Sequence, residues 1–220
     1  MSGMRKTISD KMLRSHHEVP AVTLVTRADV TELEEVRGKI NAEDRPRISL
    51  TDFLVRAAAL ALREHPLINS TIQGGRVILQ EEVAVGVAVA LDAGLIVPVI
   101  RTADRLPVRE VSTRLHDLAE RARQGTLGAA ECNGGTFTIT NLGMYGITEF
   151  TPLINVPESA ILGVGAVEEV LRRGLSGGIE PRQLVSLCLT HDHRHIDGAP
   201  AAAFLGRVRA LLENCWALLA

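Results

Sequence analysis

The stretch AILGVGAVEEVLRRGLSGGIEPRQLVSLCLTHDHRH, residues 160–195, decides the predicted fold. Residues 160–173 and 182–195 are both rich in β-branched and other apolar side chains, which is typical of strands. The glycines between Gly174 and Gly178 predict a turn that joins the two strands. We therefore predict two strands linked by a turn, as part of a large central sheet.

Helices and strands alternate along the rest of the chain. Helical periodicity and capping signals predict helices over residues 4–17, 31–41, 52–65, 107–123 and 199–215. Alternating or continuous apolar patterns predict strands over residues 17–31, 70–73, 76–80, 83–91, 95–100 and 134–143. This order predicts an α/β protein, an α+β sandwich in which a large central mixed sheet carries flanking helices.

Several local signals refine these boundaries. Thr31 followed by Glu34 resembles a capping box, and Thr51 or Ser49 is expected to cap the helix over residues 52–65. That helix has a wide apolar face, which predicts deep burial. The apolar runs at residues 83–91 and 95–100 are expected in the middle of the sheet.

Composition excludes some classes of function. The chain has 220 residues, a formal net charge of −2 and 3% aromatic residues, so it shows no general attraction to nucleic acid or to anionic membranes. No apolar run reaches the roughly 18 residues of a membrane-spanning helix, and the basic N-terminal segment lacks the apolar part of a signal peptide. We therefore expect a cytoplasmic location. The cysteines form neither a zinc pattern nor a disulfide framework.

The end of the quoted stretch, LTHDHRHIDG at residues 189–198, contains three histidines at alternate positions. On a strand His191, His193 and His195 would face the same way and could bind one metal ion. Alternatively, His191 and His195 cap a strand at the surface. His193 could instead act as a general base, held by the Asp197-Gly198 turn, with Asp197 accepting hydrogen bonds or pairing with an arginine.

A general base needs a partner that stabilises the charge it creates. In GGTFTITNLG, residues 134–143, Thr136, Thr138 and Thr140 share one face of the predicted strand. A hydroxyl at the end of that strand could donate a hydrogen bond to an oxyanion. Alternating threonines are also ordinary strand formers, so the residues alone leave both interpretations open.

The motif H-x-x-x-D-G, from His193 to Gly198, resembles the active-site motif of the dihydrolipoamide acyltransferases of the 2-oxoacid dehydrogenase complexes. Chloramphenicol acetyltransferase has a similar motif and fold. Four other stretches resemble this family in the same order along the chain: MRKTISDKM, GVAVALDAGLIVPVIRTADR, GGTFTITNLGMYG and FTPLINVPESAILGVG. The resemblance implies the chloramphenicol acetyltransferase-like fold for residues 1–220 as a single catalytic domain. Residues 1–3 are a candidate cloning remnant, and no lipoyl or peripheral-subunit-binding domain is expected.

The resemblance also implies a reaction, the transfer of an acyl group between a dihydrolipoyl thiol and coenzyme A. His193 is then the general base, Thr140 the oxyanion donor and Asp197 the residue that orients the loop and the histidine. The coenzyme A channel is expected to include Asp92, Leu95 and Asn141. Coenzyme A is a substrate, the lipoyl group is carried by a separate domain, and no metal is required. Acetyl is the expected acyl group, while succinyl and branched-chain acyl groups stay open.

The same resemblance implies an assembly. We expect a homotrimer in which His193 of one chain faces Thr140 of its neighbour, and trimers that build a cubic 24-mer or a 60-mer. The expected partners are a lipoyl domain and the decarboxylase and dihydrolipoamide dehydrogenase components. The C-terminal segment CWALLA, residues 215–220, either contacts a neighbouring trimer or folds back on its own subunit.

Two positions depart from the family pattern. Ala90 stands where the family often has an acid, and His195 stands where a β-branched apolar residue is more usual. Two other functions remain open from the sequence. One is a catalytically silent structural core, and the other is a metal-dependent hydrolase that uses His191, His193 and His195.

Overall fold

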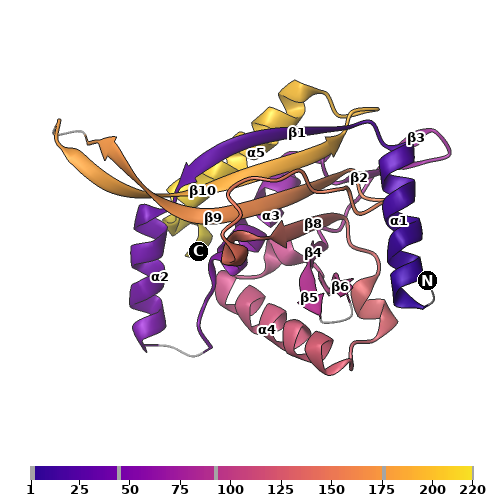
Figure 1. Ribbon diagram of the computed structural model, residues 1–220, viewed down its shortest axis with the longest axis horizontal. Helices are drawn as coiled ribbons and strands as arrows, with labels where there is room; N and C mark the ends of the chain where they lie inside the picture. Colours follow the sequence, from indigo (N-terminus) through magenta and orange to yellow (C-terminus); the bar gives the residue numbers. More distant parts are fainter. Residues whose placement is uncertain (1–2, 44–45, 92–93, 175–176, 220) are drawn as a thin grey trace.

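The central feature of the fold is a six-stranded mixed sheet (Figure 1). The computed structural model describes residues 3–43, 46–91, 94–174 and 177–219. Strands β4, β8 and β9 run parallel, and the other neighbours pair antiparallel. In spatial order the strands are β1 (Ala21–Asp29), β10 (Ile179–Asp192), β9 (Ala160–Arg173), β8 (Phe137–Asn141), β4 (Val85–Val87) and β7 (Val99–Ile100). The predicted fold class is confirmed.

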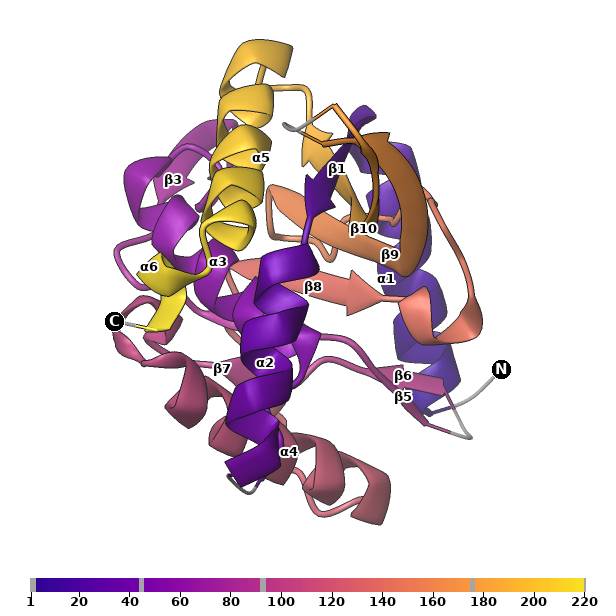
Figure 2. The same ribbon diagram turned by 90° about the vertical axis from the view of Figure 1, so that its left-hand side faces the viewer.

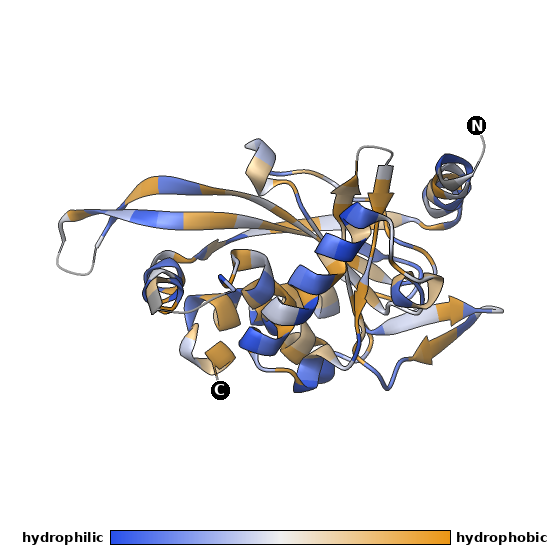
Figure 3. Cartoon of the chain, turned by 90° about the horizontal axis from the view of Figure 1, so that it is seen from below, coloured by the Kyte–Doolittle hydropathy of each residue, from blue (hydrophilic) through white to orange (hydrophobic). Residues whose placement is uncertain are grey.

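The predicted pair of long strands forms the hairpin β9–β10. Its turn-proximal half extends beyond the rest of the molecule as a twisted ribbon, at the end opposite α1 (Figures 1 and 3). The register shifts between Val185 and Leu187, which marks a bulge and bends the strand. Near the turn, Leu171 and Ile179 are exposed, whereas the other half of each strand is buried in the sheet.

Only part of each apolar run at residues 83–91 and 95–100, both expected in the middle of the sheet, belongs to the main sheet. Each run breaks into two strands, and the inner pieces β5 (Val89–Leu91) and β6 (Gly94–Ile96) form a separate two-stranded sheet. β7 lies at the edge of the main sheet, not in its middle. Pro98 interrupts the second run, because proline cannot donate a ladder hydrogen bond, and its carbonyl accepts one from the backbone N–H of Val87. The other predicted hairpin, β2 (Ser70–Gln73) and β3 (Arg76–Leu79), is confirmed.

All five predicted helices are present, within a few residues of their expected ends. They are α1 (Met4–Glu18), α2 (Thr31–Glu43), α3 (Leu50–Glu64), α4 (Val108–Gln124) and α5 (Gly198–Glu213), followed by the short α6 (Trp216–Leu219). Short 3-10 helices cover Ala103–Arg105, Ala129–Cys132 and Gly143–Tyr145. No helix in the described ranges is both long and apolar enough to cross a membrane.

The helix starts show which capping signals were right. Ser49, not Thr51, caps α3: its hydroxyl accepts from the backbone N–H of Asp52, whose carboxylate accepts from the backbone N–H of Ser49. The capping box predicted at Thr31 is wrong, although α2 does begin there. The Thr31 hydroxyl instead donates to Asp29 and accepts from the backbone N–H of Gln183, which ties α2 to β10.

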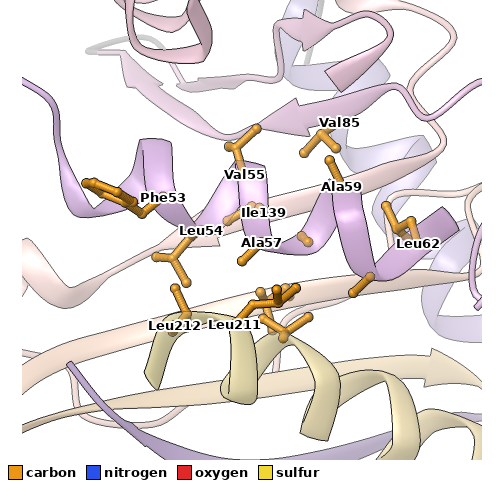
Figure 4. Packing of buried hydrophobic residues seen from close by; sticks show 14 of the residues in the cluster. Phe53, Leu54, Val55, Ala57, Ala59, Leu62, Val85, Ile139, Leu211 and Leu212 are labelled. Atoms are coloured by element: carbon orange, nitrogen blue, oxygen red, sulfur yellow. The ribbon is translucent and has the colours of Figure 1, made fainter. Parts of the chain in front are cut away.

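Helix α3 packs against α4 and α5 and is the centre of the hydrophobic core (Figure 4). Its side chains Phe53, Leu54 and Val55 are fully buried, which confirms the expected deep burial. They pack with Ile139 of β8 and Leu211 of α5, among others. This core fixes one face of β8, so residues of opposite parity on that strand must face the other side of the sheet.

The second face of the sheet is covered by the segment from Ile147 to Glu158, and α1 packs beyond it (Figure 2). The segment passes so close to β9 that side chains are excluded there. A Cβ on Gly165 would lie 1.8 Å from the carbonyl oxygen of Thr148, and one on Gly163 would lie 3.0 Å from the Phe150 ring. The Ser15 hydroxyl donates to the carbonyl of Ile154 and fixes α1 to this segment.

Candidate active site

Thr140 lies near the end of β8, on the face of the sheet opposite α3. Two cavities meet beside it, because both are lined by Ala88, Leu95 and Thr140. The first has a volume of about 270 Å³ and extends toward Met12 of α1. The second has a volume of about 380 Å³ and extends toward Arg123 of α4. A hydroxyl at this point can reach a ligand that enters from either side.

The three threonines of β8 have different hydrogen bonds. The Thr136 hydroxyl exchanges hydrogen bonds with the backbone of Ala84. The Thr138 hydroxyl donates to the carboxylate of Glu158, at 2.6 Å. The Thr140 hydroxyl has no hydrogen-bond partner among the described residues, and it is only half-buried. Thr136 is thus a structural residue, while Thr140 is available to donate to a ligand.

Two of the three residues expected along a coenzyme A channel line the cavities beside Thr140. Leu95 lines both cavities, and Asn141 lines the larger one. The Asn141 amide donates to the hydroxyl of Thr51, and its oxygen accepts from the backbone N–H of Gly143, so this side chain fixes the turn after β8. Ala90 also lines the larger cavity. Asp92 lies outside the described residues.

A buried carboxyl group stands behind the first cavity, and the sequence analysis missed it. Glu158 is 4% exposed, and its carboxylate accepts from Thr138 and from the amide of Asn155, at 2.6 and 2.7 Å. Burial raises the pKa of Glu158 to about 7, although the two hydrogen bonds and the cation of Lys11 oppose this shift. A glutamate beside a proline resembles a surface loop, so the sequence carried no signal of this burial.

His193 lies in a turn just beyond the end of β10. The strand ends at Asp192, and the next residues form the turn before α5. The expectation that three histidines share one strand face is therefore wrong. His193 is exposed, while the ring of His191 is buried and lies 5.6 Å from it, centroid to centroid.

An aspartate–arginine pair holds this turn, but the aspartate is not the expected one. The buried Asp192 carboxylate accepts three hydrogen bonds from the Arg194 guanidinium, at 2.6–3.1 Å, and one from the Arg194 backbone N–H. Asp197 is exposed at the N-cap of α5, and its side chain makes no capping hydrogen bond. Its predicted role in orienting His193 stays a prediction.

Further bonds fasten the turn to neighbouring strands. The backbone N–H of His193 donates to the carbonyl of Pro20 before β1, and the backbone N–H of Asp192 donates to the carbonyl of Ser159. The ring Nε2 of His195 lies 3.0 Å from the hydroxyl of Ser70 in β2. Because the Ser70 hydroxyl donates to the carbonyl of Leu67, we infer that Nε2 of His195 carries the proton and donates.

The surface interpretation is wrong for His191 and holds only in part for His195. His191 is fully buried and His195 is half-buried. Burial is the main cause that lowers the pKa of both rings, and it outweighs the Asp192 carboxylate, which acts in the opposite direction. Neutral imidazoles are therefore favoured at both positions.

Thr140 and His193 of one chain are far apart. Thr140 pairs with Gly163 of β9, which pairs with Cys188 of β10. Cys188 precedes His193 by five residues, which is roughly 16 Å along a strand, and two strand spacings add roughly 10 Å across the sheet. A single chain thus presents the two candidate groups at separate places.

Comparison with known proteins identifies the family. Residues 1–220 match the family described as 2-oxoacid dehydrogenases acyltransferase (catalytic domain). The chain belongs to this family.

Relatives of this acyltransferase domain include components with different acyl groups. The chain is 41% identical to the dihydrolipoyllysine-residue acetyltransferase component of the acetoin cleaving system of Bacillus subtilis, over 100% of the chain and 56% of that protein. It is 36% identical to the dihydrolipoyllysine-residue succinyltransferase component of the 2-oxoglutarate dehydrogenase complex of Rickettsia bellii, over 97% of the chain and 54% of that protein. The chain spans about half the length of the curated relatives it matches.

Solved structures show the same fold. The dihydrolipoamide acetyltransferase of Azotobacter vinelandii is 36% identical, with a TM-score of 0.95 over 100% of this chain and 92% of that chain. The cubic core of the pyruvate dehydrogenase multienzyme complex gives a TM-score of 0.94 at 36% identity, with the same coverage of both chains. Chloramphenicol acetyltransferase, at 15% identity, shares the fold with a TM-score of 0.57 over 96% of each chain.

The described residues of the acyltransferase domain show no arrangement that favours the metal-hydrolase alternative. In the described part of the chain, no three His, Cys, Asp or Glu side chains are grouped so as to hold a metal ion.

In the C-terminal segment, Leu218 is buried in its own subunit, whereas Trp216 is 59% exposed and donates from its indole nitrogen to Glu32 of α2. The C-terminal segment thus folds back on its own subunit at Leu218, and the Trp216 ring stays partly exposed to solvent.

Proposed function

We propose that the chain is the catalytic domain of a dihydrolipoamide acyltransferase that moves an acyl group, acetyl by expectation, between dihydrolipoamide and coenzyme A. The observation that carries this proposal is the hydroxyl of Thr140, which lies at the junction of two cavities and has no hydrogen-bond partner in the part of the chain that the structure describes. One substrate can approach from each side and meet at this hydroxyl. The family membership and the exposed His193 in a fastened turn support the same reaction.

The proposed chemistry needs one base and one hydrogen-bond donor. His193 removes the proton from the thiol of coenzyme A, because a thiolate is the nucleophilic form. The sulfur attacks the thioester carbonyl carbon of the acylated dihydrolipoyl group, and the Thr140 hydroxyl donates to the resulting oxyanion. The carbon–sulfur bond to the dihydrolipoyl group then breaks, and the departing sulfur takes the proton from His193. A thioester replaces a thioester, so the reaction is reversible.

The distance between Thr140 and His193 within one chain supports a site shared between copies. We propose a homotrimer in which His193 of one copy faces the cavities beside Thr140 of the next.

In the Azotobacter vinelandii enzyme, a serine, a histidine and an asparagine were investigated for their roles in the catalytic mechanism, and the histidine and asparagine are four positions apart. His193 and Asp197 have the same spacing, which supports the predicted role of Asp197.

Assembly beyond the trimer is part of the same proposal. A relative of nearly identical fold forms the cubic core of a pyruvate dehydrogenase multienzyme complex. We propose that trimers of this chain build a comparable core, cubic or 60-meric, served by a lipoyl domain and by decarboxylase and dihydrolipoamide dehydrogenase components. A coenzyme A channel that includes Leu95, Asn141 and Asp92 belongs to this proposal.

The test is a direct transfer assay on the purified protein. Acetyl-coenzyme A and dihydrolipoamide are supplied, and both S-acetyldihydrolipoamide and free coenzyme A are measured by mass spectrometry. We expect both products in equal amounts, with formation dependent on dihydrolipoamide. A silent structural core would release no coenzyme A above the rate without protein, and that result would reject the proposal. Mass measurement in solution of the same sample reports the trimer or the larger core.

A further inference from the structure

The cavity between Thr140 and α1 has an uncharged wall. Eleven described residues line it: eight are apolar, three are neutral and polar, and none is charged. Its apolar part includes Met12, Leu153 and Ile161, and its polar part consists of Thr138, Thr140 and Asn155. A carboxylate that enters this cavity therefore leaves water without gaining a counter-charge from the described lining residues, which is costly.

Among the described residues, the carboxyl group of Glu158 is hydrogen-bonded to this wall from behind, and the Lys11 cation of α1 also acts on that carboxyl group. Both polar side chains that flank Thr140 on the wall, Thr138 and Asn155, donate to the carboxyl group of Glu158. The amide of Asn155 also donates to the Thr138 hydroxyl, at 3.0 Å, so the three side chains form a closed network. Because both donors face Glu158, the carboxylate lies one side chain behind the cavity surface.

We propose that Glu158 is a specificity-determining residue, which makes this acyltransferase select uncharged acyl groups and reject those that end in a carboxylate, such as succinyl. This inference rests on the proposed acyl-transfer function and names its substrate class. Two negative charges separated by one side chain in a partly buried site repel strongly enough to lower a rate roughly tenfold or more. An acetyl group carries no charge and does not experience this repulsion.

The charge of Glu158 depends on pH near neutrality, which gives the proposal a distinctive signature. Burial raises the pKa of Glu158 to about 7, so the charged fraction of this group increases between pH 6 and pH 8. Lys11 of α1 is the charged residue that acts on it, and the Lys11 cation favours the carboxylate. The terminal carboxyl of a succinyl group stays charged over this range, because an ordinary carboxyl titrates near pH 4.

The experiment compares acetyl-coenzyme A with succinyl-coenzyme A as donors to dihydrolipoamide, at pH 6, 7 and 8. The quantity measured is the ratio of the two kcat/KM values. Ionisation of a shared base changes both rates alike and cancels in the ratio. We expect the wild-type protein to favour acetyl, with a preference several-fold larger at pH 8 than at pH 6. In Glu158→Gln, we expect roughly tenfold less preference at pH 8 and no pH dependence.

The matched control is Glu149→Gln, the same chemical change at an exposed residue of the same segment that does not line the cavity. It should keep both the preference and its pH dependence. Thermal unfolding and assembly mass check that Glu158→Gln folds. If that variant fails to fold, the wild-type pH series alone decides the question, because a structural role would not change the ratio.

A preference that is equal at pH 6 and pH 8, or succinyl transfer as fast as acetyl transfer at pH 8, would overturn this inference and leave the acyltransferase proposal standing. Absence of transfer from every donor would overturn both. Unchanged discrimination in a folded Glu158→Gln protein would also remove Glu158 from the account of specificity.

Discussion

The end of β8 and the end of β10 each present one candidate catalytic side chain, but they hold it in opposite ways. At the end of β8, Thr140 has no hydrogen-bond partner among the described residues and opens onto two cavities. At the end of β10, the backbone around His193 is held by Pro20, Arg194 and Ser70. The first region offers an unused donor to a ligand, and the second fixes the backbone that carries an exposed ring.

This difference indicates how a site divided between copies can stay precise. A hydroxyl on a buried sheet strand is positioned by the ladder itself, through Gly163 on one side and β4 on the other. A ring in a surface turn has no ladder and needs dedicated contacts. If copies associate so that the ring faces the cavity, each copy supplies a group whose backbone is already fixed. Substitutions at the two ends should therefore act differently.

The largest effect is expected at His193. His193→Ala should lower kcat by about 10²–10⁴-fold, the loss typical of a missing general base. Since His193 is exposed and its ring makes no hydrogen bond in the described structure, the free energy of unfolding of the variant should stay within ~0.5 kcal/mol of that of the wild type. Transfer kinetics measure the loss of kcat, and calorimetry measures the stability. Near-normal turnover in the variant would reject the assignment of the base.

The next effect is expected at Thr140. Thr140→Val keeps the shape of the side chain but removes the hydroxyl, so kcat should fall by about 10²–10³-fold, as for a lost oxyanion donor. The matched variant Thr140→Ser keeps the donor and should retain most of the activity. Coenzyme A binding, measured by calorimetry, should be largely unchanged in both. Equal activities of the valine and serine variants would show that the hydroxyl does not contribute.

The shared site can be tested with the same variants. Inactive His193→Ala and Thr140→Val proteins are unfolded together, mixed and reassembled. Some interfaces then combine an intact His193 from one copy with an intact Thr140 from another, so part of the activity should return. Each variant reassembled alone is the control. If thoroughly mixed assemblies regain nothing, both groups must act from within one chain, and the separation along the sheet would need another explanation.

The comparison also shows what the sequence could predict. Periodicity identified the helices and the β9–β10 hairpin, because apolar spacing reports which face an element buries. It could not show that the run at residues 83–91 leaves the sheet after Val87, since an apolar run has the same composition in either sheet. The family motif pointed to His193 and Thr140. The pattern could not show that Asp192 pairs with Arg194 or that Glu158 is buried, because both facts depend on residues brought together by folding.

A smaller effect is expected from the ion pair under the turn. Arg194→Met leaves the buried Asp192 carboxylate without its strongest partner, so the free energy of unfolding should fall by roughly 1.5–3 kcal/mol. Denaturant unfolding measures this loss. Adding Asp192→Asn should recover part of it, because the buried charge is then removed as well. A double variant that is less stable than Arg194→Met would show that the carboxylate is satisfied by other groups.

The smallest effect is expected at His195, whose ring nitrogen is hydrogen-bonded to Ser70. His195→Val should lower turnover only a few-fold, since the Arg194 and Pro20 contacts still hold the turn. Ser70→Ala removes the same bond from the other side, so the two effects should not add in the double variant. Additive losses would mean that the two residues act independently.

The same residue should make stability depend on pH. Burial lowers the pKa of His195, so the native ring binds a proton less readily than the ring in the unfolded chain. Unfolding therefore takes up protons as the pH falls below about 6.5, and the free energy of unfolding falls with it, by at most roughly 1.4 kcal/mol per pH unit for one group. In His195→Val this dependence should be weaker between pH 7.5 and 5.5, with the remainder due to groups such as His191, whose pKa is also lowered by burial. Identical slopes in the wild type and in His195→Val would show that the His195 ring is not held neutral by the fold, and the donor role inferred for its Nε2 would lose its support.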